Sequence, residues 1–155
     1  MAASSAGLCL WRFVDGALHV LIVHPGGPFW AKKDDGAWSL PKGEYDPATE
    51  DGALAARREF NEEIGQPAPV GDLTPLGETK LKSGKLVQAW AICGDLDADT
   101  IESNTFEMEW PPRSGRRQAF PEIDRALWCD APTAARKLNP AQVVFINRLV
   151  ELHTD

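Results

Sequence analysis

The sequence predicts an α+β fold in which a mixed β-sheet lies between helices. Two apolar segments joined by Asp-Gly near the N-terminus indicate a β-hairpin, and a proline-free segment rich in Ala, Leu, Arg and Glu indicates a helix at 50–64. An amphipathic segment at 140–152 indicates a further helix after another group of strands. A length of 155 residues suits a single domain that spans residues 1–155 and buries a sizeable core.

The first half of the chain is expected to open with strands. Residues 6–14 and 17–24 are apolar and rich in strand-forming residues, so they are predicted to pair across the Asp-Gly turn. Gly and Pro then predict a loop at 24–36. A short third strand is predicted within 37–43, ending at Pro41.

The helix predicted at 50–64 has one apolar face. Ala53, Ala56, Phe60 and Ile64 recur at the 3.6-residue period of an α-helix. We therefore expect this face to pack on the sheet.

The rest of the chain is expected to add strands and then to end in helices. A proline suits the first turn of the last helix, because that position needs no N–H. The predicted strands are 73–81, 86–93, 104–110 and 126–129, and the predicted helices are 131–138 and 140–152.

Composition and charge restrict the function. The chain is 43% hydrophobic and 25% charged, which is typical of a globular protein, and its net charge is -7. This charge argues against nucleic acid as a partner, because non-specific binding draws on Lys and Arg contacts to phosphates. An anionic small-molecule substrate would arrive with metal cations.

The cysteines and the N-terminus indicate a cytoplasmic protein. Cys9, Cys93 and Cys129 have no metal-ligand spacing and are interpreted as reduced thiols. The N-terminal segment lacks the basic region of a signal peptide, and no apolar run reaches the length of a transmembrane helix. We therefore expect no membrane partner.

Three glutamates, Glu59, Glu62 and Glu63, are crowded on the predicted helix. On a helical wheel they occupy a sector of about 100°, and like charges at this spacing destabilise a helix by roughly 0.2–0.5 kcal/mol per pair. Either this is an ordinary solvated helix face, or a cation lies among the carboxylates. Arg58 is placed to pair back towards Glu50, about two turns away. Carboxylate oxygens on one rigid face also suit Mg²⁺ or Mn²⁺.

Residues 40–66, LPKGEYDPATEDGALAARREFNEEIGQ, resemble the Nudix box. That pattern is glycine, five residues, glutamate, seven residues and then REUxEExGU, in which U is a bulky apolar residue. Residues 58–65 match every fixed position at the correct distance after Glu50. Six residues rather than five separate Gly43 from Glu50, and Gln66 occupies the final apolar position.

The similarity to Nudix proteins extends beyond the box. The order of predicted elements resembles the Nudix α/β/α sandwich, and segments 24–47 and 107–125 resemble a bacterial subgroup of Nudix hydrolases without a clearly assigned substrate. The resemblance implies hydrolysis, with Mg²⁺ or Mn²⁺, of a pyrophosphate bond in a nucleoside diphosphate linked to another group. Dinucleoside polyphosphates and nucleoside triphosphates are favoured, because three arginines in one predicted loop suit phosphate-rich substrates. Nucleotide sugars, NADH-like dinucleotides and capped RNA ends are the open alternatives, of which capped RNA is disfavoured by the net charge.

The resemblance also implies roles for the residues of the box. Glu59 and Glu63 are expected to bind the metal, with Glu62 as a further ligand or as the base. The backbone carbonyl of Gly43 is expected to join the metal ligands. The residues expected to orient these ligands are Glu50 and Arg58.

Residues outside the box are further candidates for the catalytic base, because some Nudix enzymes take it from a later strand or loop. Glu107 and Glu109 are two residues apart and would face one side of a predicted strand. A polar strand edge is the alternative. Glu122, in the following loop, is a weaker candidate.

The segment 111–117 concentrates three arginines in an acidic protein. Arginine binds phosphate oxygens in bidentate fashion, so this loop is a hypothetical site for the distal phosphates, together with Lys32 or Lys33. A solvated hairpin tip is the alternative. The substrate-binding candidates are Lys42, Arg113, Arg116 and Arg117.

Several aromatic residues flank these segments. Phe29, Trp30 and Trp110 are candidates for stacking on a base, although aromatic side chains more often pack in cores. His24 ends an apolar strand and is interpreted as a structural hydrogen-bonding group, because no second His or Cys lies at ligand spacing from it.

Two other classes of protein are the alternatives to an enzyme. One is a non-catalytic Nudix-fold module that senses a nucleotide or binds a protein, which the presence of all box carboxylates disfavours. The other is a calcium-binding structural domain, which is disfavoured because its ligands would lie in a loop and not on a helix. A homodimer is expected by analogy with Nudix enzymes alone.

Overall fold

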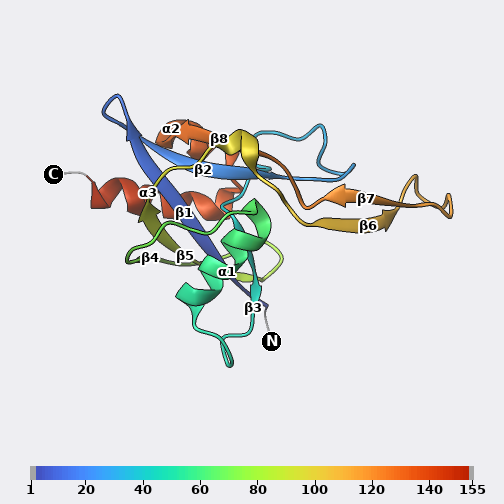
Figure 1. Ribbon diagram of the computed structural model, residues 1–155, viewed down its shortest axis with the longest axis horizontal. Helices are drawn as coiled ribbons and strands as arrows, with labels where there is room; N and C mark the ends of the chain where they lie inside the picture. The colour runs from blue at the N-terminus through green and yellow to red at the C-terminus, as the bar shows by residue number, and fades with distance from the viewer. Residues whose placement is uncertain (1–2, 154–155) are drawn as a thin grey trace.

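The computed structural model describes residues 3–153 as a six-stranded sheet with helices on both faces and a separate two-stranded hairpin (Figure 1). The strand order in the main sheet is β4-β5-β1-β2-β8, with β3 also paired to β1. The predicted α+β fold with a mixed sheet is confirmed. The elements are β1 (Ser4–Val14), β2 (Ala17–Pro25), β3 (Lys42–Tyr45), α1 (Gly52–Ile64), β4 (Thr74–Lys80), β5 (Leu86–Cys93), the 3₁₀ turn η1 (Ala98–Thr100), β6 (Thr105–Glu109), β7 (Arg117–Pro121), β8 (Ile123–Asp130), α2 (Ala131–Lys137), the 3₁₀ turn η2 (Pro140–Gln142) and α3 (Val143–Leu152).

The long strand β1 organises the sheet. It runs parallel to β5, and on its other edge it pairs antiparallel with two different strands. Residues 11–14 pair with β2, whereas residues 4–7 pair with β3. Helix α1 contacts both β1 and β3. The sheet therefore holds β3 directly beside the helix that carries the box.

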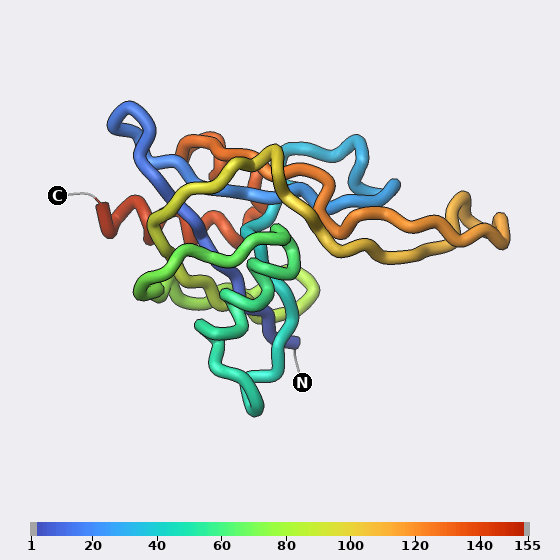
Figure 2. Tube along the Cα trace, in the orientation of Figure 1, coloured from blue at the N-terminus to red at the C-terminus, as the bar shows by residue number. Residues whose placement is uncertain are grey.

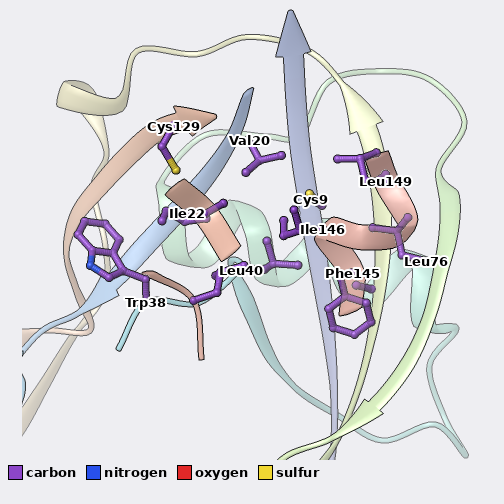
Figure 3. Close-up of a cluster of buried hydrophobic side chains, with 14 of the residues drawn as sticks. Cys9, Val20, Ile22, Trp38, Leu40, Leu76, Cys129, Phe145, Ile146 and Leu149 are labelled. Atoms are coloured by element: carbon purple, nitrogen blue, oxygen red, sulfur yellow. The ribbon is translucent and has the colours of Figure 1, made fainter. Parts of the chain in front are cut away.

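Apolar side chains form a cluster on each face of the sheet. The cluster under α1 includes Leu21 and Phe60. The cluster on the opposite face, under α2 and α3, includes Ile22 and Phe145 (Figure 3). Successive residues of β2 thus enter opposite clusters, which is why this strand reads as a continuous apolar run.

Helix α1 begins two residues later than the sequence predicts. The Asp51 carboxylate caps it by accepting a hydrogen bond from the Leu54 N–H at 3.2 Å. Gly65, at φ 80°, ends it in the left-handed conformation. Ala53 is only partly buried, whereas the other three residues of the predicted apolar face are buried.

The third strand lies later in the chain than the predicted 37–43. Strand β3 begins at residue 42, while Trp38 and Ser39 form only isolated bridges. Pro41 has no N–H to donate to a sheet ladder, so it separates the two segments.

Strand β7 is not predicted by the sequence pattern. Its residues, RQAFP, contain a proline and lack an apolar alternation. Strand β8 begins at residue 123, earlier than the predicted 126–129. The predicted helix at 140–152 is divided into η2 and α3.

Strands β6 and β7 form an antiparallel hairpin, here called the arm, that projects from the main sheet (Figures 1 and 2). Contacts with the loop after β2 fix its base. The Glu122 N–H donates to the Asn104 carbonyl at 2.8 Å, and the Gly26 N–H donates to the Glu122 carbonyl at 2.9 Å. Phe106 packs so closely on Gly27 that an added Cβ there would overlap its ring.

The cysteines agree with the prediction of free thiols. Cys9 and Cys129 are buried and Cys93 is exposed, and all three are unpaired. Between residues 3 and 153, no helix has the length and apolar character needed to cross a membrane.

Candidate active site

Two of the three crowded glutamates of α1, Glu59 and Glu62, contact a cation, which is the guanidinium group of Arg58. Its Nε and Nη2 each lie 2.8 Å from one carboxylate oxygen of Glu50. Its Nη1 lies 2.8 Å from Glu59 Oε1 and 3.3 Å from Glu62 Oε1. The predicted pairing of Arg58 with Glu50 is confirmed, and these hydrogen bonds hold the pKa of the Glu50 carboxyl below its ordinary value.

Glu63 points instead towards β3. Its Oε2 accepts a hydrogen bond from the Lys42 N–H at 3.0 Å. Burial raises the pKa of Glu63 to about 8, and it also raises the pKa of Glu59. Burial likewise lowers the pKa of the Lys42 ammonium group. A cation bound at Glu63 would favour its ionised form.

Strand β3 also brings the backbone of Gly43 against Glu59. A Cβ built on Gly43 would overlap the Glu59 carboxylate. Only glycine permits this approach of strand to helix, so two of the residues predicted as metal ligands lie side by side.

Replacing Gly43 by alanine should lower hydrolytic activity by about 10-fold or more while leaving the fold intact. The new methyl group would displace the Glu59 carboxylate, which is the far end of a flexible side chain. Nucleotide hydrolysis rates and thermal melting of Gly43→Ala measure the two effects. Full activity in this variant would contradict a role for the contact between Gly43 and Glu59.

A cavity of about 160 Å³ opens beside Glu63. Lys42 and Glu122 line it with Glu63, and the negative charge of Glu122 contributes to the raised pKa of Glu63. The sequence makes Glu122 a weaker candidate for the catalytic base than Glu107. No local sequence pattern indicates that the junction between the arm and β8 lies beside α1. The other lining residues are Val23, Pro25, Ser39, Leu40 and Ile123.

The candidates on the arm lie apart from α1. Glu107 Oε2 is 3.7 Å from Arg117 Nε on an exposed surface, and Glu109 lies opposite Arg117 in the strand register. Arg113 and Arg116 are exposed at the tip, which points away from α1 (Figures 1 and 2). The base of the arm, at Glu122, therefore lies beside the box residue Glu63. The strands and tip of the arm lie away from the box.

The aromatic candidates lie at the surface, between the loop after β2 and the arm. Phe29 and Trp30 are 61% and 40% exposed. Phe29 meets Trp110 edge to face, with 5.6 Å between ring centroids, and Lys33 Nζ lies 4.9 Å from the centroid of the Trp30 ring. The contact between Phe29 and Trp110 joins the loop to the arm.

Two larger cavities, of about 710 and 500 Å³, lie along β8. Neither is lined by a box carboxylate. In the first, the Arg12 guanidinium stacks 4.0 Å from the centroid of the Trp128 ring and pairs with Asp95. The carboxylate chemistry is therefore found at the small cavity beside Glu63.

The box residues fit a divalent cation by their chemistry. In the part of the chain that the structure describes, no three His, Cys, Asp or Glu side chains are gathered to hold an ion. Two of the box carboxylates, Glu59 and Glu62, are instead paired with Arg58. Hard carboxylate oxygens and the backbone of Gly43, which lies against the Glu59 carboxylate, are ligands of the kind that Mg²⁺ or Mn²⁺ prefers.

Comparisons with known proteins agree with the fold. A C. elegans Ap4A hydrolase is 20% identical, with a TM-score of 0.66 over 98% of both chains. A MutT protein from Methanosarcina mazei Go1 is 18% identical, with a TM-score of 0.62 over 99% of this chain and 96% of the other. The NUDIX domain of Shewanella oneidensis NrtR, complexed with ADP ribose, is 15% identical, with a TM-score of 0.67 over 99% of this chain and 90% of the other.

A family model provides the assignment. The model of the NUDIX domain matches residues 3–149, which is nearly the whole chain. Together with the matching box residues 58–65, this match shows that the chain belongs to the NUDIX domain family and is a Nudix-type hydrolase.

Proposed function

We propose that the protein hydrolyses a pyrophosphate bond in a nucleoside diphosphate linked to another group, in a reaction that depends on Mg²⁺ or Mn²⁺. The observation that carries this proposal is the arrangement around α1. Gly43 approaches Glu59, while Lys42 and Glu122 meet Glu63 at one cavity. Carboxylates, the ammonium group of Lys42 and the backbone of Gly43 thus lie near one another around α1.

The glutamates of the box would hold the metal, and the carbonyl of Gly43 would join them. When bound, divalent ions neutralise charge on the phosphoryl oxygens during in-line attack. Arg58 makes two hydrogen bonds to Glu50, which would remain if Glu59 and Glu62 turned to a cation. Arg58 and Glu50 therefore orient the ligand carboxylates.

Glu122 is the proposed base. Attack by water forms a new P–O bond and breaks the bond from phosphorus to the bridging oxygen, and the proton lost by the water passes to the Glu122 carboxylate. Its position across the cavity from Glu63 supports this role. Glu107, which pairs with Arg117 on the arm, is the alternative base.

The proposed phosphate contacts have two origins. Lys42 lies beside Glu63 and would bind a phosphate next to the metal site. Arg113, Arg116 and Arg117 would attract a polyphosphate to this end of an acidic molecule, because a local cluster of one charge steers ligands of the opposite charge.

Dinucleoside polyphosphates and nucleoside triphosphates are the proposed substrates. The likeness to an Ap4A hydrolase and to a MutT protein supports this choice. A panel of these nucleotides, with nucleotide sugars and dinucleotides such as NADH as comparison substrates, tests it with Mg²⁺, Mn²⁺ or EDTA. We expect metal-dependent release of a nucleotide and a phosphate-containing product from one class.

The panel also distinguishes the alternative, a nucleotide-sensing or protein-binding module. Such a module would bind a nucleotide without turnover, even though it retains the box. Tight binding of a panel member with no product in either metal would overturn the proposed hydrolysis.

Stabilisation by metal should increase with pH. The pKa of Glu63 is about 8 in the folded chain and near 4.5 when it is unfolded, so the folded protein holds more protons between these values. The contribution of Glu63 to metal-free stability is therefore greatest below pH 4.5 and falls as pH rises towards 8. A cation needs the ionised carboxylate, so the rise in Tm on adding Mn²⁺ should be larger at about pH 8.5 than at about pH 6. A Glu63→Gln variant should lose this difference, and an unchanged difference would contradict the role of Glu63.

A further inference from the structure

His24 is a buried histidine whose two ring nitrogens both meet acceptors. Nδ1 lies 2.8 Å from Asp124 Oδ1, and Nε2 lies 2.7 Å from the Lys33 carbonyl oxygen. Its side chain has no exposed surface and packs edge to face on Trp38, with 5.1 Å between ring centroids. The ring thus joins the end of β2 to the loop after this strand and to the start of β8.

The two acceptors determine the protonation of the ring. A carbonyl oxygen only accepts hydrogen bonds, so Nε2 must carry a proton. The Asp124 carboxylate is partly exposed and lies 3.6 Å from Arg125 Nε. An ionised carboxylate also only accepts, so Nδ1 must carry a proton as well. Against an ionised Asp124, this geometry is that of a doubly protonated ring.

Asp124 is the extra residue of a β-bulge. His24 lies opposite Arg125 and Pro25 lies opposite Ile123, so Asp124 has no partner of its own on β2. The other charged groups near this site lie around Trp38. They are Arg125 and Lys137, whose cationic groups lie 5.2 and 5.6 Å from its ring, and Asp34, which accepts from its Nε1.

The bulge determines which side chains line the cavity beside Glu63. It places Ile123 in the apolar cluster under α1, and Ile123 and Glu122 both line this cavity. A regular register would put Asp124 opposite Pro25, in the place of Ile123. A carboxylate would then face the apolar cluster, and Glu122 would shift by one residue along the chain.

We propose that His24, as a doubly protonated ring held between Asp124 and the Lys33 carbonyl, fixes this bulge and so positions Glu122 at the carboxylate site. The inference rests on the proposed function in assigning Glu122 as the base. His24 touches none of the reacting groups, and it acts through the bulge alone.

NMR of ¹⁵N-labelled protein tests the protonation state. At neutral pH, both nitrogens of the His24 ring should show the chemical shifts of protonated imidazolium nitrogens. His24→Gln serves to assign these signals. A neutral ring with one unprotonated nitrogen would overturn the proposal.

Amide hydrogen exchange tests the bulge without reference to activity. In His24→Gln, exchange of the amides at 122–125 should become about 10-fold faster or more, because the register is no longer fixed. His19→Gln is the matched control, because His19 lies at the opposite end of β2, across from Asp130. Equal exchange at 122–125 in both variants and the wild type would overturn the proposal.

Kinetics on a substrate from the panel test the link to Glu122. His24→Gln should lower kcat by about 10-fold or more with little change in KM, yet cause no further loss in a Glu122→Gln background. A general loss of folded protein would lower kcat equally in both backgrounds, and that result would overturn the proposal. If no substrate is hydrolysed, the proposed function is wrong. The NMR and hydrogen-exchange results still test whether His24 is doubly protonated and fixes the bulge.

Discussion

Replacing Glu63 by glutamine should lower kcat by at least about 100-fold without unfolding the protein. Loss of a residue that only orients a metal ligand already lowers metal affinity or activity by about 10- to 100-fold, and loss of the ligand itself should do more. The amide oxygen of glutamine can still accept the hydrogen bond from the Lys42 N–H. A neutral side chain also suits this half-buried position, which is where burial raises the pKa of the carboxyl. The measurement is steady-state hydrolysis of the best panel substrate, together with thermal melting.

Glu151→Gln provides the control for the loss of one negative charge. Glu151 is exposed on α3, which covers the opposite face of the sheet from α1. We expect its kcat to match that of the wild type. A Glu63→Gln variant with the kcat of the wild type would contradict the assignment of the metal site.

Glu122→Gln should also lower kcat strongly, by about 100-fold or more, because a positioned general base contributes this much in many enzymes. KM should change little, since the amide keeps the shape of the side chain. The measurement is the rate of hydrolysis at saturating substrate, where kcat alone is compared. Metal binding should be retained, which separates this variant from Glu63→Gln.

Glu107→Gln is the matched variant, because Glu107 is the base that the sequence favours outside the box. It is exposed on the arm and pairs with Arg117 at 3.7 Å. We expect less than about a 2-fold change in its kcat, as for most surface substitutions away from a site. A large loss in Glu107→Gln with full activity in Glu122→Gln would reverse the assignment and would require the arm to move to α1.

Much of the fold is predictable because its signals are local. The Asp-Gly turn predicts the β1–β2 hairpin, and the apolar period of α1 predicts its buried face. The box residues belong to one continuous segment of sequence. The pairing of Arg58 with Glu50 is predictable too, because both residues lie in that segment.

The features that the sequence does not predict depend on contacts between distant segments. Strand β7 has little strand character of its own and forms by pairing with β6. Glu122 reaches Glu63 only because the base of the arm is fixed against the loop after β2. The hydrogen bond from His24 to Asp124 likewise joins residues that are 100 positions apart.

The most direct test of the proposed metal site is a count of bound Mn²⁺ by electron paramagnetic resonance. The wild type and a Glu59→Gln/Glu62→Gln/Glu63→Gln variant would be compared, with Mg²⁺ as a competitor. We predict Mn²⁺ bound to the wild type, displaced by Mg²⁺, and lost in the variant. Equal binding of Mn²⁺ by both proteins would show that the box carboxylates do not hold the metal, and it would contradict the proposed metal-dependent hydrolysis at α1.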